Sequence, residues 1–363
     1  MDETSIESCF VEFPTRDWRD SDAAGTVRIA VVGLGQFARN RALPAIADSS
    51  LCEMTTLVSG SPEKAERLAT EYDADHVVSY EEFRDGRVTE AYDAVYVATP
   101  NAYHAQYTEV AAAQGKHVLC EKPLATSVAE AEEMVAACED AGVTLMTAYR
   151  LQTEPAVRRV RELVVEGVIG DPRHVSGWFA YRNPDQSPSA DNWRRDSSVA
   201  GGGAMIDLGV YPLNTARFIL GADPVGAYAT TVVDTSGAAG DHDRVEARAT
   251  FQLAFPDGVD ATGFASFDTY SDNRLQVLGS EGRALIVSPF GGTVTQEVVV
   301  ERGEARTSYA GSPVDEVVEE FEYFAYCVLT GTEPEPDGRD GVADLRAVEA
   351  IYESAERGER VEV

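Results

Sequence analysis

A glycine-rich turn between an apolar run and a helical segment constrains the fold more than any other feature of the sequence. Gly33, Gly35 and Ala38 follow an expected strand at residues 27–32 and open an expected helix at residues 36–47. In this context the first glycine permits a tight turn, the second lets a pyrophosphate approach the backbone, and the alanine keeps helix and strand close. The motif therefore predicts a unit that binds a dinucleotide.

The alternation of strand and helix continues to about residue 148. Further strands are expected at residues 52–58, 93–98, 117–120 and 143–148, with helices at residues 62–72, 102–114 and 127–141. Repeated alternation of this kind predicts an α/β fold with a doubly wound parallel sheet. In this pattern Glu121-Lys122-Pro123 closes the strand at residues 117–120 and holds a lysine in a rigid turn.

After residue 150 the pattern changes. Helices near 155–166 and 204–219 are followed by strand-like runs at 224–233, 244–254, 259–268, 274–279, 283–288 and 293–301, and then by helices at 314–329 and 341–357. Turn signals between these runs predict an α+β domain with a large, mostly antiparallel open sheet. We therefore expect an N-terminal arm at 1–25, a Rossmann domain at 26–149 and a second domain at 150–363.

Acidic residues outnumber basic ones along the whole chain. The 62 Asp and Glu residues against 30 Lys and Arg residues give a formal net charge of −32. This charge argues against nucleic acid or an anionic membrane as a partner, and its even spread indicates the acidic surface of a halophilic protein. Only Lys64, Lys116 and Lys122 are lysines, so each is a candidate for a specific role.

The sequence carries no targeting or metal-binding signal. No apolar stretch approaches the roughly 20 residues of a membrane span, and the acidic N-terminus lacks the basic start of a signal peptide. The five cysteines show no Cys-x-x-Cys spacing, and the five histidines show no His-Glu-x-x-His pattern. A cytoplasmic protein with reduced thiols and no metal is therefore expected.

The end of the second strand indicates which dinucleotide binds. An acid there would hold the ribose 2′-hydroxyl of NAD, but the sequence reads Ser59-Gly60-Ser61 and continues to Lys64. Two hydroxyls, free amides at a helix start and a lysine suit a 2′-phosphate, so NADP is expected. The alternative is that residues 59–61 form only a turn, with Ser61 as a helix cap and Lys64 as an exposed helix residue.

An acid and a phenol follow in a glycine-rich block at residues 201–211. Asp207 and Tyr211 are four positions apart, which places them on one face of a helix, although Pro212 removes a helical hydrogen bond beside them. Oxidation of an alcohol needs a base for its proton. A free tyrosine has a pKa of about 10, and the Lys122 ammonium would favour its phenolate. A carboxylate close to the phenol would have the opposite effect, so Asp207 is assigned an orienting role.

Together these motifs resemble the glucose-fructose oxidoreductase, inositol dehydrogenase and rhizopine-catabolism family, from about residue 27 to the C-terminus. The matching residues are Gly33-Leu34-Gly35, Ala98-Thr99-Pro100-Asn101 with His104, Glu121-Lys122-Pro123, Tyr149-Arg150, Trp193-Arg194 and residues 201–211. Members with histidine at the position of Tyr211 resemble inositol dehydrogenases, whereas tyrosine resembles aldose and dihydrodiol dehydrogenases. The resemblance thus implies NADP-dependent oxidation of an aldose at C1 to the lactone, with D-xylose and D-xylonolactone expected.

The resemblance also implies the residues of each subsite. Those expected to contact the cofactor are Gly33, Leu34, Gly35, Gln36, Phe37, Ser59, Gly60, Ser61, Lys64, Thr99, Pro100, Asn101, His104, Glu121, Lys122 and Arg150. Those expected to contact the sugar are Lys122, Tyr149, Arg150, Trp193, Arg194, Asp207 and Tyr211, of which Lys122, Asp207 and Tyr211 carry the chemistry.

Structural alternatives remain for several of these residues. Tyr149 and Arg150 suit packing or a salt bridge, Trp193 suits a core beside a surface arginine, His104 suits a loop contact, and Asn214 suits helical filler. For the whole protein the alternatives are a dehydrogenase of another cyclic polyol or a trans-dihydrodiol, and a non-catalytic NADP-binding regulator. A homo-oligomer formed through the C-terminal sheet is expected from the resemblance.

Overall fold

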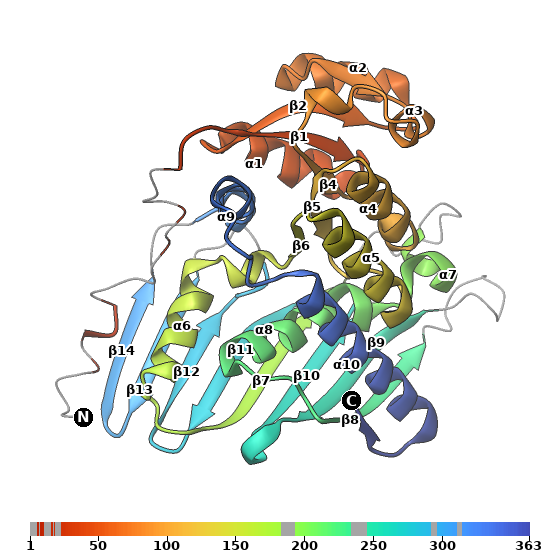
Figure 1. Cartoon of the computed structure of the whole chain (residues 1–363). Coiled ribbons are helices and arrows are strands. Elements are labelled where there is room, and N and C mark those ends of the chain that lie inside the picture. Colours follow the sequence, from red (N-terminus) through yellow and green to blue (C-terminus); the bar gives the residue numbers. More distant parts are fainter. Residues whose placement is uncertain are drawn as a thin grey trace. The chain divides into compact units, whose positions relative to one another are not determined.

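The chain folds into two compact units (Figure 1). The computed structural model describes residues 6, 8–10, 16, 18, 23–182, 193–233, 245–291, 296–310 and 314–363. The parallel-sheet unit comprises Arg16–Arg150 and Asp315–Val342, and the mixed-sheet unit comprises Met1–Thr15, Leu151–Val314 and Ala343–Val363. Residues 315–342 thus group with the first sheet, whereas the sequence pattern placed them in the second domain. Most of the expected arm at 1–25 lies outside the described residues.

The parallel-sheet unit contains the predicted doubly wound sheet. Its strands are β1 (Val27–Val32), β2 (Cys52–Val58), β3 (His76–Val78), β4 (Ala94–Val97), β5 (His117–Glu121) and β6 (Leu145–Ala148). The order is β3-β2-β1-β4-β5-β6, and all neighbouring strands are parallel. The α/β prediction is confirmed, and only the short β3 had no expected counterpart.

Helices make up much of the rest of this unit. They are the π-helical turn η2 (Ala38–Ala42), α1 (Leu43–Asp48), α2 (Pro62–Tyr72), α3 (Tyr80–Arg84), α4 (His104–Ala113), α5 (Val128–Ala141) and α9 (Glu316–Thr330), with 3₁₀ turns η3 (Thr89–Ala91), η4 (Asn101–Tyr103) and η5 (Arg150–Gln152). Pro62 occupies the first turn of α2, where its missing N–H costs nothing.

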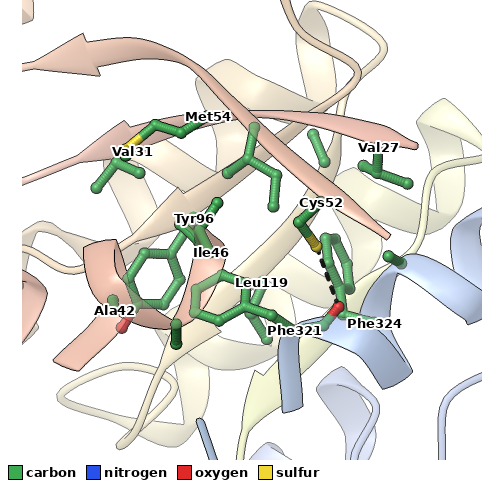
Figure 2. Close-up of a cluster of buried hydrophobic side chains, with 14 of the residues drawn as sticks. Val27, Val31, Ala42, Ile46, Cys52, Met54, Tyr96, Leu119, Phe321 and Phe324 are labelled. Atoms are coloured by element: carbon green, nitrogen blue, oxygen red, sulfur yellow. Dashed lines mark hydrogen bonds between the residues drawn. The ribbon is translucent and has the colours of Figure 1, made fainter. Parts of the chain in front are cut away.

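The core of this unit explains why α9 belongs to it. Phe321 and Phe324 of α9 are fully buried against β1, β2 and β4, and Figure 2 shows them beside Cys52 and Tyr96. The Cys52 thiol also donates a hydrogen bond of 3.4 Å to the Phe321 carbonyl. Each buried aromatic ring stabilises the fold by about 1.5–3 kcal/mol. Burial therefore attaches α9 to the first sheet, although α9 begins nearly 200 residues after β5 in the sequence.

The mixed-sheet unit is built on nine strands. They are β7 (Pro172–Ala180), β8 (Gly226–Val233), β9 (Glu246–Ala254), β10 (Asp260–Ser266), β11 (Asp272–Gly279), β12 (Gly282–Val287), β13 (Glu297–Arg302), β14 (Ala305–Ala310) and β15 (Val361–Glu362). The order is β14-β13-β12-β11-β7-β10-β9-β8-β15. Within this sheet, β7 and β10 are the only described neighbours that pair in parallel, which confirms the mostly antiparallel sheet. The central strand β7, with β14 and β15, had no expected counterpart.

The remaining helices include the segment that carries Asp207 and Tyr211. They are α6 (Pro155–Val165), α7 (Ser197–Ala200), η8 (Met205–Gly209), α8 (Val210–Leu220) and α10 (Gly338–Arg357), with 3₁₀ turns η7 (Trp193–Arg195) and η9 (Pro256–Gly258). Helix α8 packs closely on β7, because a Cβ at Gly177 would lie 2.5 Å from the Cβ of Pro212. Glycine at this point brings α8 down onto the centre of the sheet. No described helix is both long and apolar enough to cross a membrane.

Candidate active site

The glycine-rich turn lies where the strand order of the parallel sheet reverses. Gly33 follows β1 with φ of +98°, and a Cβ there would lie 2.7 Å from the Ala98 carbonyl oxygen after β4. At Gly35 a Cβ would meet no described atom within 4 Å. Dinucleotides bind at this reversal point, with the pyrophosphate against the loop and the following helix. The residues present therefore fit the predicted cofactor.

The end of β2 carries hydroxyl groups and a lysine close to this turn. The buried Ser59 accepts a hydrogen bond of 3.1 Å at Oγ from the backbone N–H of Ser61. Ser61 occupies the N-cap position of α2 but makes no side-chain capping bond. Lys64 donates from Nζ to the Leu34 carbonyl at 3.3 Å, so the structure brings Lys64 to the glycine-rich turn.

Sequence reasoning overlooked a second cation at the same turn. Arg39 donates from Nε to the Gly35 carbonyl at 3.2 Å. Arg39 and Lys64 therefore bond to consecutive carbonyl groups of the loop. The four-residue spacing between Gly35 and Arg39 on a helix was the available signal.

His104 connects the loops that follow β4 and β5. Its ring is fully buried, with Nδ1 2.9 Å from the Pro123 carbonyl oxygen and Nε2 3.0 Å from the Thr99 carbonyl oxygen. Burial lowers the pKa of His104, although the bonded carbonyl groups act in the other direction. Both ring nitrogens face backbone, which favours the loop-holding alternative. Thr99 and Asn101 are also buried.

Lys122 follows β5 and is next in the chain to Glu121, whose carboxylate accepts two hydrogen bonds. Glu121 accepts a hydrogen bond of 2.6 Å from the Tyr96 hydroxyl and one of 3.2 Å from the backbone N–H of Lys122. Burial raises the pKa of Glu121, while Tyr96, Lys122 and Arg150 act to lower it. Lys122 itself is partly buried. These bonds fix the backbone from which the lysine side chain extends.

Arg150 lies in a buried ion pair. It donates from Nη1 to Oε1 of Glu316, and Arg41 approaches the same oxygen at 3.5 Å. Tyr149 is buried as well. The salt-bridge alternative for Arg150 is therefore observed, and contact of Tyr149 or Arg150 with cofactor or sugar stays a prediction.

Glu320, like Glu316, is a buried carboxyl group of the parallel-sheet unit. Glu320 is 1% exposed, and its Oε1 has no hydrogen-bond partner among the described residues. Burial raises the pKa of Glu320 well above its usual range, the negative charges of Glu121 and Glu316 add to this effect, and Arg150 opposes it. The group is therefore favoured in its neutral form.

We expect Glu320→Gln to stabilise the protein at neutral and alkaline pH. When the pKa of a carboxyl group is higher in the folded state than in the unfolded state, the group adds most to the free energy of unfolding below its unfolded-state pKa of about 4.3. This contribution is lost as the pH rises towards the pKa of the folded state. Glutamine does not ionise, so the variant avoids this loss of stability. Its melting temperature should exceed that of the native protein by about 2–4 °C for each kcal/mol by which ionisation of Glu320 destabilises the native protein.

Thermal melts from pH 4 to pH 9 test this expectation. The difference between the two proteins should shrink towards pH 4. Glu319→Gln is the matched control, since Glu319 accepts hydrogen bonds from Arg16 at 3.1 Å and Trp18 at 2.9 Å and its replacement should destabilise at neutral pH. A Glu320 variant that melts below the native protein at pH 8 would show that the carboxylate is needed.

Asp207 and Tyr211 lie in the mixed-sheet unit, the first within a helical irregularity and the second just after it. The expected single helix is instead the π-helical turn η8 followed by α8, and the Val210 N–H donates to the Met205 carbonyl five residues back. Pro212, which has no N–H to donate, follows this wider turn. The structure thus corrects the expectation of one regular helix.

Aromatic and cationic side chains surround these two groups. The Tyr211 ring packs edge-on against Phe179 at 5.4 Å between centroids and contacts Phe290 at 6.1 Å. Arg194 lies with Nε 3.7 Å from the Asp207 carboxylate, and its guanidinium lies 4.6 Å from the Trp193 ring centroid. The structure therefore joins Arg194 to Asp207, as a shared sugar site would require, whereas Lys122 belongs to the parallel-sheet unit.

Asn214 is part of a buried polar network. It accepts a hydrogen bond of 3.0 Å from Gln152 and donates one of 2.9 Å to Asp344. Arg217 also donates to Asp344. These contacts hold Asn214 within the interior of the mixed-sheet unit, and whether it also reaches the sugar stays untested.

The folds of the two units and these motifs define an oxidoreductase of the dinucleotide-binding class. Residues 27–149 match the family described as "Oxidoreductase family, NAD-binding Rossmann fold", and residues 157–285 match the "GFO/IDH/MocA C-terminal domain". The chain belongs to this Gfo/Idh/MocA family, which confirms the resemblance inferred from its motifs.

Named relatives and solved structures agree with this assignment. The D-xylose 1-dehydrogenase [NADP(+)] of Haloarcula marismortui is 40% identical over 95% of each chain. The D-xylose 1-dehydrogenase (NADP(+)) 2 of Haloferax volcanii is 34% identical over 92% of this chain and 98% of that protein. The aldose-aldose oxidoreductase from Caulobacter crescentus, solved with glycerol, has a TM-score of 0.86 and 34% identity over 93% of this chain and all of that one. Assembly through the mixed sheet stays a prediction.

Proposed function

We propose that the protein oxidises an aldose, D-xylose foremost, at C1 to the lactone and uses NADP as the hydride acceptor. The observation that carries this proposal is the similarity over nearly the whole chain to two proteins named as NADP-dependent D-xylose 1-dehydrogenases. The absence of an acid at the end of β2, where Ser59 and Lys64 lie instead, supports the choice of NADP.

In this proposal the parallel-sheet unit holds the cofactor. The loop from Gly33 to Phe37 receives the pyrophosphate, and Ser59, Gly60, Ser61 and Lys64 receive the 2′-phosphate. Thr99, Pro100 and Asn101 line the nicotinamide side, and His104 holds their loop through the Thr99 carbonyl. When bound, the oxidised nicotinamide accepts a hydride.

The protein's own groups handle the sugar and its proton. Tyr211 removes the proton of the C1 hydroxyl while the C1–H bond breaks and its electron pair leaves as hydride, so that a C=O bond forms. The Lys122 ammonium stabilises the phenolate. Asp207 orients the sugar or the lysine, and Arg194 and Trp193 contact the ring. The proposal makes Lys122 and Tyr211 act on one hydroxyl during turnover.

A screen for NADPH formation tests the proposed function. Purified protein in molar KCl, chosen because of the net charge of −32, is assayed with pentoses, hexoses, cyclic polyols and a trans-dihydrodiol. D-xylose should give the highest kcat/KM with NADP. A clear preference for a polyol or dihydrodiol would replace the substrate, and tight NADP binding without turnover of any of them would favour a regulator.

We expect Ser59→Asp to weaken the use of NADP. A carboxylate beside the 2′-phosphate repels it, and two unit charges 4 Å apart interact by between about 1 kcal/mol in bulk water and about 4 kcal/mol at an effective dielectric constant of 20. The KM for NADP should therefore rise about 10–100-fold, while the KM for NAD should change much less. Ser59→Ala is the control, because it also removes the oxygen that accepts from Ser61 but adds no charge. Equal use of NAD and NADP by the native protein would contradict the cofactor assignment.

A further inference from the structure

A buried carboxylate contacts the glycine-rich block that precedes Asp207. Glu246, the first residue of β9, is 6% exposed. Its two carboxylate oxygens accept the backbone N–H of Gly203 at 3.0 Å each, and Oε1 also accepts the Met205 N–H at 2.8 Å and the Tyr352 hydroxyl at 3.0 Å. These hydrogen bonds compensate the burial of the Glu246 carboxylate.

The glycines of the block are needed for this contact. A Cβ at Gly203 would lie 2.1 Å from the backbone oxygen of Glu246, and one at Gly202 would lie 2.0 Å from the Tyr352 hydroxyl oxygen. Only glycine therefore lets the backbone approach β9 and α10 so closely. The N–H groups at the start of a helical segment lack partners within the segment, and a carboxylate there is favourable.

The contact reaches both groups proposed for the chemistry through two short chains of backbone bonds. Glu246 holds the Gly203 N–H, and the Gly203 carbonyl accepts the Asp207 N–H at 3.0 Å. Glu246 also holds the Met205 N–H, and the Met205 carbonyl accepts the Val210 N–H, next to Tyr211. Movement of Glu246 would therefore displace both Asp207, within the π-helical turn, and the point where the turn meets α8.

We propose that Glu246 is a positioning residue for the reaction, which sets the separation of the Asp207 carboxylate and the Tyr211 phenol by fixing the turn between them. This inference rests on the proposed function. Burial raises the pKa of Glu246, and its bonded donors act to lower it. Burial and the adjacent Glu246 raise the pKa of Tyr352 well above its usual range, so Tyr352 remains a hydrogen-bond donor near neutrality.

Steady-state kinetics of three variants test the proposal. Glu246→Ala removes every acceptor, and Glu246→Gln keeps the shape and one acceptor oxygen. Tyr352→Phe is the comparison variant: it leaves the carboxylate and its backbone bonds, and removes a hydroxyl that also bonds to the backbone of Gly203 and Ile206. Because a misplacement of about 1 Å can cost 10²-fold in rate, we expect kcat/KM for the sugar to fall about 100-fold in Glu246→Ala, about 10-fold in Glu246→Gln and less than about 3-fold in Tyr352→Phe. The dissociation constant for NADP should change less than about twofold in all three.

A merely structural role predicts a different pattern. If Glu246 only stabilises the fold, the variants have lower melting temperatures, but the sugar KM and the pH profile of the folded enzyme match those of the native protein. That result would overturn the proposal. Glu246→Gln keeps the test decisive should Glu246→Ala not fold.

Amide hydrogen exchange gives a readout that does not depend on turnover. The Gly203 and Met205 amides should exchange at least about 10-fold faster in Glu246→Ala and Glu246→Gln, whereas amides of the parallel sheet should not change. If the native protein oxidises no sugar, the proposed function fails, and exchange at these two amides still decides whether Glu246 holds the turn. Unchanged exchange would refute that role.

Discussion

Replacement of Lys122 by alanine should lower turnover by about 10³-fold. The ammonium is expected to stabilise charge that develops as the sugar hydroxyl loses its proton, and loss of one such stabilising group typically costs 10²–10³ in kcat. Folding should persist, because the backbone at Lys122 is held by Glu121 and by the His104 contact with Pro123. Binding of NADP should weaken only a few-fold.

The same assay on Lys116→Ala provides a matched control. Lys116 is another lysine of the parallel-sheet unit and donates to the Tyr92 carbonyl at 2.9 Å, but no proposed step uses it. Its variant should retain turnover within about threefold. A Lys122 variant that performs as well as the Lys116 variant would make Lys122 a structural residue.

Tyr211→Phe should lower sugar oxidation by about 10²–10⁴-fold, the usual loss when a general base is removed. The ring and its packing against Phe179 and Phe290 remain, so a cavity cannot explain the loss. We would measure kcat/KM for the sugar from pH 5 to pH 10 for both proteins. Near-normal rates with the native pH profile would assign the base to Asp207 or to water.

Local patterns predicted most of the fold. The bounds of β1, β2 and α2 follow from the sequence because each element is a continuous apolar run or a proline-started helix. Strand β7 was overlooked because buried and partly exposed residues mix along it, although it forms the centre of its sheet. The grouping of residues 315–342 with the first sheet depends on the burial of Phe321 and Phe324, which no local pattern expresses.

The sequence also predicted only part of the candidate site. Short motifs predicted the glycine-rich turn, Lys122, Asp207 and Tyr211, since each stands in a distinctive local sequence. The supporting residues were not predicted, because they are distant in the sequence. Glu246 lies 43 residues from Gly203, and Tyr352 lies a further 106 residues from Glu246. Contacts of this kind depend on the sheet register and on the packing of α10, and both emerge only in the folded chain.

Transfer of a labelled hydride tests the central claim most directly. The native protein is incubated with NADP and D-xylose carrying deuterium at C1, and the recovered cofactor and sugar product are analysed by mass spectrometry and NMR. The account predicts one deuterium in the NADPH and unlabelled D-xylonolactone or its hydrolysis product. Recovery of unlabelled NADPH together with a product that keeps deuterium at C1 would contradict oxidation at that carbon.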